Sequence, residues 1–168
     1  MESFKQSLSQ HPFFQGLDSG HLRKLARIAS SKSFPAHQMI FYEGEKANEF
    51  YLISEGKVAI EMPLFGCEDI QIQTLGKGDV LGWSWLFPPY LWHFSARAVQ
   101  PTQAIAMDGE ALRTLCEEDH HLGYDVVKRF AQVMVQRLEA TRVRFLSFPD
   151  PKEHEFPAVP RGVHLPEE

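Results

Sequence analysis

The sequence predicts a mainly β protein with flanking helices, of the double-stranded β-helix type (jelly-roll or β-roll). Three observations predict this fold class. Helical spacing of apolar residues is confined to the two ends of the chain. Between them, short apolar stretches are separated by glycine-bearing turns, which is typical of an antiparallel sandwich or barrel. A length of 168 residues with 43% hydrophobic residues fits one globular domain with a core of its own.

Residues 1–32 are expected to form N-terminal helices. Leu22, Leu25 and Ile28 recur there at helical spacing. Asp18 or Ser19 is a suitable N-cap for the second helix, because either side chain can accept a hydrogen bond from a free backbone N–H.

Residues 33–107 are expected to form the β-roll. Apolar and other residues alternate within its short stretches, as in "FYLISE" at residues 50–55 and "IQIQ" at residues 70–73. Turn signals separate the stretches; they are Pro35, Glu43-Gly44, Glu55-Gly56, Gly66 and the run from Gly76 to Asp79. Two further strands are expected around Pro101.

Residues 108–147 are expected to form a short helix capped by Asp108 and then a long one, with His120 and His121 in a solvated turn between them. The long helix carries apolar positions spaced alternately by four and three, as in a coiled-coil seam. They are Val127, Ala131, Met134, Leu138, Thr141 and Phe145. A second stripe beside it consists of Val126, Phe130 and Val133. We therefore expect one stripe to pack on the β-roll and the other to form a homodimer; the alternative is one broad buried face on a monomer.

Bulk properties exclude several classes of protein. A net charge of −5 argues against a bulk nucleic-acid or acidic-membrane binder. Cys67 and Cys116 are too few for a disulfide framework, and the N-terminus lacks the apolar core of a signal peptide. With no bilayer-spanning run, a cytoplasmic location is expected. Residues 148–168, rich in proline and charge, are expected to form an extended tail.

The pattern of reactive residues favours neither an enzyme nor a metalloprotein. The β region offers only His37 and His93 and has no His-x-His pair, so we expect no metal site. No G-x-S-x-G elbow is present, and neither cysteine has an activating neighbour pattern, so no catalytic residue is assigned.

The order of helix, β-roll, short helix and long helix resembles the cyclic-nucleotide-binding domain of the catabolite-activator (CRP/FNR) superfamily. Three segments carry the resemblance: "MIFYEGEKANEFYLISEGKVAI", "LGKGDVLGWSWLF" and "ARAVQPTQAIAMDGEALRTL". It covers approximately residues 5 to 147 and needs no large insertion. The DNA-binding helix-turn-helix domain of many members has no counterpart in the tail, so specific DNA binding is not expected.

In that family a Gly-Glu pair opens the short helix of a phosphate-binding cassette, and a later arginine pairs with the cyclic phosphate. The resemblance places Gly82 at the glycine, Trp83 at the glutamate and Trp92 at the arginine. Arg97 is not expected to replace the arginine, because alternation along a strand directs it to the opposite face from Trp92. Both polar anchors of a cyclic nucleotide are therefore replaced by indoles.

The candidate ligand-binding residues are Gly82, Trp83, Ser84, Trp85, Leu86, Tyr90, Trp92 and His93. Three interpretations stay open. The rings fill the pocket and nothing binds; the pocket is remade for a flat or apolar ligand held by stacking; or a cyclic nucleotide binds atypically. The resemblance implies a stand-alone regulatory or sensor module without a cofactor. Its expected partners are a small planar effector, a second copy of the chain and a protein that the sequence does not identify.

Overall fold

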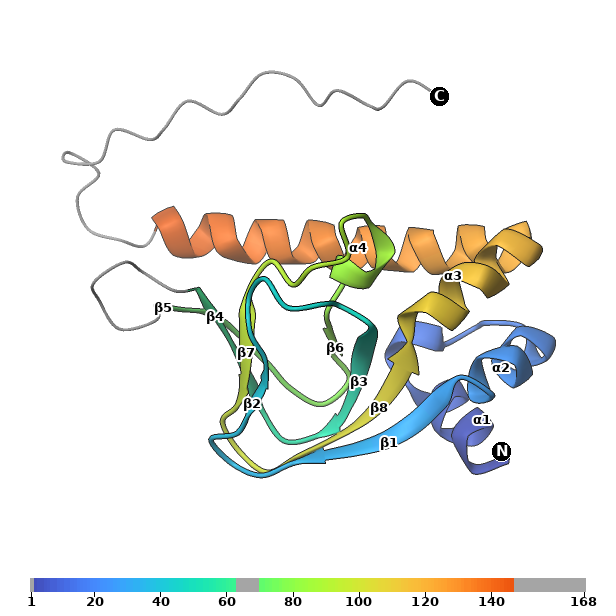
Figure 1. The fold of residues 1–168 in the computed structure, drawn as a ribbon, viewed down its shortest axis with the longest axis horizontal. Coiled ribbons are helices and arrows are strands. Elements are labelled where there is room, and N and C mark those ends of the chain that lie inside the picture. Colours follow the sequence, from blue (N-terminus) through green and yellow to red (C-terminus); the bar gives the residue numbers. More distant parts are fainter. Residues whose placement is uncertain (1, 63–69, 147–168) are drawn as a thin grey trace, which may run out of the picture.

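The computed structural model describes residues 2–62 and 70–146 and confirms the predicted β-roll with helices at both ends (Figure 1). The described strands form two four-stranded antiparallel sheets, in the orders β1-β8-β3-β6 and β2-β7-β4-β5. The strands are β1 (Ala29–Phe34), β2 (Met39–Phe41), β3 (Glu49–Glu55), β4 (Val58–Met62), β5 (Ile70–Leu75), β6 (Val80–Leu81), β7 (Ser95–Ala98) and β8 (Thr102–Asp108). The tail, with residues 147–168, and Cys67 lie outside the described residues.

The N-terminal helices are α1 (Glu2–Gln10), the short 3₁₀ helix η1 (Pro12–Phe14) and α2 (Ser19–Ala26). Asp18 is the N-cap of α2, as predicted, and accepts a hydrogen bond from the backbone N–H of Gly20 at 2.7 Å. Phe14 and Leu25 are fully buried, so these helices close one end of the roll with apolar side chains.

Strand β3 is buried on both faces from Phe50 to Ile53, more deeply than simple alternation implies. Phe50 faces helices, since its ring lies 5.2 Å from that of Phe130, whereas the ring of Tyr51 contacts Phe34 at 5.7 Å on the other face. When both faces of a sheet are covered, a strand in its middle has a continuous run of apolar residues. This coverage positions α4 over β3.

Two helices follow the roll, α3 (Gly109–Glu118) and α4 (His120–Leu146). Asp108 caps α3 as predicted, accepting from the N–H of Ala111 at 2.9 Å. The expected turn at His120 and His121 was wrong: both belong to the first turn of α4. Asp119 stops α3 and accepts from the N–H of Leu122 at 3.2 Å, so a single residue between the helices suffices.

Helix α4 carries one buried and one exposed apolar stripe. Val126 and Phe130 are fully buried against the roll, and Val133 packs on the same core. On the other stripe the exposed fraction is 47% for Val127 and 71% for Leu138. Of the rest of that stripe, Ala131 is exposed, Met134 and Thr141 are half-buried, and the side chain of Phe145 lies outside the described part. No described helix has the length and apolar character needed to cross a membrane.

Candidate functional site

The cassette, residues 82–93, begins with a glycine whose place only glycine can fill. Gly82 follows β6 with φ at +93°, in the left-handed region that side chains rarely adopt. A Cβ atom there would lie 2.6 Å from Cζ3 of Trp92. The indole of Trp92 therefore lies directly against the Gly82 backbone.

Trp92 is held in the interior of the roll. It is only 4% exposed, and its indole stacks on the ring of Phe41 with a centroid distance of 3.7 Å and an interplanar angle of 7°. Its backbone N–H donates to Glu45 O at 2.9 Å, and its carbonyl accepts from Gly44 N–H at 2.9 Å. Because both backbone and ring are paired, Trp92 is a fixed part of the core.

Trp85 lies in the core under the helices. It is fully buried, stacks on Phe50 at 5.1 Å and meets Phe130 of α4 edge-on at 5.3 Å. Its carbonyl accepts from the guanidinium of Arg113, on α3, at 2.5 Å. The sequence grouped Trp85 with Trp83 and Trp92 as ligand-binding; in the structure its ring packs against Phe50 and against Phe130 of α4.

Trp83, which is half-buried, and His93, which is exposed, form the outer part of the cassette. The rings of Trp83 and His93 stack at 4.8 Å with an interplanar angle of 21°. Ser84 is buried, and its hydroxyl shares a 2.8 Å hydrogen bond with Nδ1 of His93. This bond ties the short helix η2 (Ser84–Leu86) to the residue that follows Trp92. His93 itself is exposed.

Trp83 also forms one wall of an open groove against α4. The groove has a volume of about 410 Å³ and is lined by Trp83, Met134, Val135, Arg137, Leu138 and Thr141. Its walls are mostly apolar, with the indole on one side and the helix on the other. Such walls suit a flat ligand better than a charged one.

The remaining predicted residues, Leu86 and Tyr90, lie at the edge of the cassette that faces α3. Leu86 packs on the core, and the guanidinium of Arg113 lies 4.1 Å above the ring of Tyr90. Arg113 therefore fastens both ends of the loop that leads from η2 to Trp92. Sequence reasoning missed Arg113, because no local pattern links an arginine on α3 to a distant loop.

Arg97 lies outside the cassette, as predicted. Its Nε donates to the carboxylate of Glu61 on β4 at 3.0 Å. The predicted alternation holds only in part: Trp92, Phe94 and Ala96 are buried and His93 is exposed, but Ser95 is buried too, and β7 begins only at Ser95. Between Gly82 and His93 the chain contains no Asp, Glu, Lys or Arg. In the described part of the chain, no group of three or more His, Cys, Asp or Glu side chains is arranged to hold a metal ion.

Comparisons with known proteins agree on one family. Residues 31–119 match the model of the cyclic nucleotide-binding domain. A solved structure from Geobacter metallireducens, described as that of a cyclic nucleotide-binding protein, has 30% sequence identity and a TM-score of 0.72, covering 80% of this chain and 97% of that one.

Two further proteins are similar over most of this chain. A CRP-like cAMP-activated global transcriptional regulator of Mycobacterium tuberculosis is 25% identical over 134 residues, which are 80% of this chain but 58% of the regulator. The regulatory subunit of a cAMP-independent protein kinase A from Trypanosoma cruzi, solved bound to guanosine, has 23% identity and a TM-score of 0.66, covering 87% of this chain and 51% of that one. The second likeness shows the fold alone.

Proposed function

The chain belongs to the family of cyclic nucleotide-binding domains, and from that premise we propose that it is a regulatory module that does not take cyclic AMP in the usual way. The observation that carries the proposal is the position of Trp92. Its ring fills the space above Gly82, and the resemblance places it where relatives hold an arginine for the cyclic phosphate.

The missing charges support the same conclusion. A cyclic phosphate needs charge-assisted hydrogen bonds or several free amides, because its desolvation is costly. The cassette has no guanidinium and no carboxylate, and Pro88 and Pro89 have no N–H to donate. Trp83 stands at the glutamate position and stacks on His93, so the ribose hydroxyl also loses its acceptor.

The groove between Trp83 and α4 favours a second candidate function, the sensing of a flat, uncharged ligand. An indole wall and an apolar helix face supply stacking area without a need for a phosphate. The Trypanosoma cruzi protein was solved with guanosine, a nucleoside without phosphate, which supports a role for such ligands in this fold. A ligand inserted there would touch the cassette and α4 together and would shift the packing of α4.

We also propose that α4 forms a homodimer through its exposed stripe. Tyr124 extends the predicted seam by one position and is 66% exposed, and Leu138 is 71% exposed. Large apolar side chains at seam spacing on one helix face are typical of a helix–helix interface. The ligand-free alternative, a module that signals only by docking to partners, uses this same surface.

Tryptophan fluorescence tests the proposal, because all three tryptophans lie in the cassette. The protein is titrated with cyclic AMP, cyclic GMP and guanosine. We expect no saturable change with either cyclic nucleotide up to about 1 mM, a binding free energy of roughly −4 kcal/mol. Saturable quenching by cyclic AMP at micromolar concentration would overturn the proposal.

The guanosine arm separates the two candidate functions. Quenching by guanosine that disappears in the Trp83→Phe variant supports the flat-ligand function, because that variant keeps an aromatic wall but loses the indole reporter. A response that survives in Trp83→Phe points to a site elsewhere. No response to guanosine in the parent protein favours the ligand-free module.

A further inference from the structure

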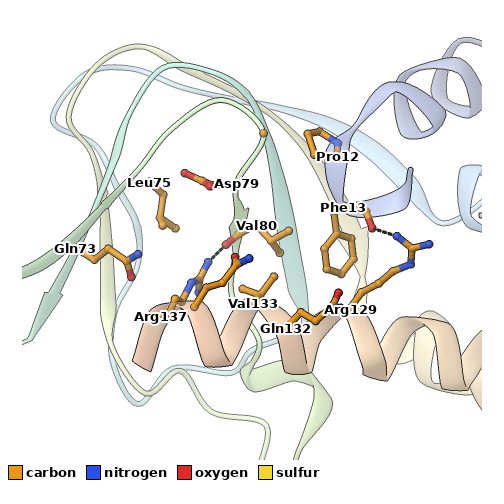
Figure 2. Close-up of a pocket in the computed structure, with 12 residues that line it drawn as sticks. Pro12, Phe13, Gln73, Leu75, Asp79, Val80, Arg129, Gln132, Val133 and Arg137 are labelled. Atoms are coloured by element: carbon orange, nitrogen blue, oxygen red, sulfur yellow. Dashed lines mark hydrogen bonds between the residues drawn. The ribbon is translucent and has the colours of Figure 1, made fainter. Parts of the chain in front are cut away.

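A second cavity, outside the cassette, lies between α4, the short helix η1 and strands β5 and β6 (Figure 2). Its volume is about 270 Å³. Three units form its walls: η1 with Pro12 and Phe13, the edge of the roll with strands β5 and β6, and one face of α4. None of the cassette residues lines it, but Arg137 lines both this cavity and the groove beside Trp83.

Arg137 is the dominant polar group of this cavity. Figure 2 shows it rising from α4 toward Val80, whose carbonyl accepts a hydrogen bond from Nη2. Within the described residues, no carboxylate lies within ion-pair distance of this guanidinium. Burial lowers the pKa of Arg137 to about 10, although Asp79 partly offsets this by attraction. A partly buried cation with one neutral acceptor is poorly compensated, because a guanidinium has five N–H donors.

The second arginine of the cavity, Arg129, already donates hydrogen bonds to backbone carbonyls. Arg129 donates to the carbonyl of Phe13 at 2.6 Å and to the carbonyl of Gln15 at 3.1 Å. Figure 2 shows its guanidinium directed toward η1 and away from Arg137. Arg129 therefore fixes α4 to the N-terminal segment, whereas Arg137 keeps donors free toward the cavity.

Three carboxamides and one acid complete the polar lining. Gln73 comes from β5, and Gln132 and Gln136 come from α4. Asp79 lies at the rim, where its carboxylate accepts from Gly76 N–H at 2.7 Å. Two guanidiniums, Arg129 and Arg137, and one carboxylate, Asp79, leave the lining with a net charge of one positive unit, because hydrogen bonds to carbonyls do not neutralise Arg129. That balance favours a single negative charge that carries hydrogen-bond donors, and it disfavours a phosphate dianion, which Asp79 would repel.

We propose that this cavity binds a small organic carboxylate that also carries a hydroxyl or amino group. The carboxylate pairs with Arg137, the donor group faces Asp79, and the glutamine side chains take the remaining polar atoms. The volume lies just below the range of about 300–1,000 Å³ that is typical of drug-sized ligands, which restricts the occupant to a small metabolite. Such a ligand would bridge α4 and β6 and would strengthen their contact.

Thermal unfolding tests this proposal with L-lactate as the probe, a monocarboxylate with a hydroxyl donor, at constant ionic strength set with sodium chloride. We expect lactate to raise the unfolding midpoint saturably in the parent protein, since a ligand that binds only the folded state stabilises it. Inorganic phosphate is expected to give less than a tenth of the lactate affinity. No saturable rise with lactate overturns the proposal, and so does equal or tighter binding of phosphate.

Two variants and one control locate the effect. Arg137→Gln should abolish the lactate response, whereas Arg142→Gln, an exposed arginine of the same helix outside the cavity, should keep it. Gln132→Glu adds a carboxylate to the lining at an exposed position, and this carboxylate would repel the carboxylate of lactate. We expect this variant to bind lactate at least tenfold more weakly. It provides the test if Arg137→Gln does not fold. An unchanged response in Gln132→Glu contradicts the proposal. The cyclic nucleotide titration of the parent protein tests the cassette separately, because lactate is not expected to change the tryptophan fluorescence. Arg137→Gln also alters the groove beside Trp83, so Gln132→Glu, which lies outside that groove, is the variant that separates the two sites.

Discussion

At the scale of single residues, Gly82 and Trp92 determine each other's place. The glycine has no Cβ, so the indole can lie against its backbone, and the indole in turn stacks on Phe41. A guanidinium in place of this indole would leave the hollow open. The proposed arginine of relatives at this position would therefore differ from Trp92 in both charge and volume.

Gly82→Ala should be more destabilising than an ordinary glycine substitution. Adding a Cβ in the left-handed region costs about 1–2 kcal/mol. The clash with Trp92 adds about 1–3 kcal/mol of overpacking. Gly16→Ala is the matched control, because Gly16 also has positive φ, at +80°, but nothing within 4 Å of the added Cβ. Urea unfolding of both variants measures the difference, and equal losses would show that Trp92 does not press on Gly82.

Some residues could be predicted from the sequence and others could not. Asp18 and Asp108 were identified as caps, because capping depends on the residue type and its immediate neighbours. Trp85 was assigned to the candidate ligand site, with packing in the core left as an alternative. Its ring orientation depends on Phe50 and Phe130, which are far from it in the sequence, and local spacing does not encode such a contact.

At the scale of secondary-structure elements, α4 joins the N-terminal helices, the cassette and the roll. Phe130 meets Phe13, Phe50 and Trp85 with ring centroids 4.8, 5.2 and 5.3 Å apart. The two apolar stripes of α4 were predicted from the spacing of apolar residues in the sequence, and one of them packs on the roll as expected. The start of α4 was misjudged because Asp119, which caps it, also ends α3.

Asp119, between α3 and α4, should make the stability of the folded protein depend on pH in the acid range. The pKa of Asp119 lies well below its ordinary value, first because Lys24 donates to it at 2.6 Å and also because Leu122 N–H does. The folded state therefore favours the ionised form, so its stabilisation is present above the unfolded pKa, 3.8, and is lost as pH falls below it.

Urea unfolding of the parent and Asp119→Asn between pH 7 and pH 2 checks this expectation. Near neutral pH the parent should have a larger free energy of unfolding than Asp119→Asn. This difference in unfolding free energy, the gap, should narrow as the pH falls through and below the ordinary carboxyl range. Glu118→Gln, an exposed neighbour, is the control and should show a smaller gap. A gap between the parent and Asp119→Asn that stays constant down to pH 2 would contradict the assignment.

At the scale of the whole molecule, the order of turns and strands was enough to predict the architecture. Glycine turns at residues 44, 56, 76 and 78 space the strands of a roll, and the structure has that roll with the helices as expected. The state of the cassette was not predictable, because the sequence gives the types of ring but not whether they point inward. That outcome depends on the packing of Trp92 against Phe41 and Phe94 and of Trp85 against Phe130 of α4.

The proposed dimer predicts a charge-sensitive association through α4. Leu138→Glu should shift the protein to monomers in sedimentation velocity at micromolar concentration, because a carboxylate in an apolar seam is costly to bury. Ala140→Glu adds the same charge to an exposed position of the same helix outside the seam and should leave the association unchanged. A parent protein that sediments as a monomer, or a Leu138→Glu variant that still associates, would contradict the dimer.

The most direct measurement is the cyclic AMP affinity of the Trp83→Glu, Trp92→Arg double variant relative to the parent, by titration calorimetry. Trp83→Glu, Phe87→Arg is the control, since it introduces the same charges but places the guanidinium in the exposed loop. We expect the double variant to bind cyclic AMP at least tenfold more tightly, by about 1.4 kcal/mol, than either the parent or the control. Micromolar binding of cyclic AMP by the parent, equal to that of the double variant, would contradict it.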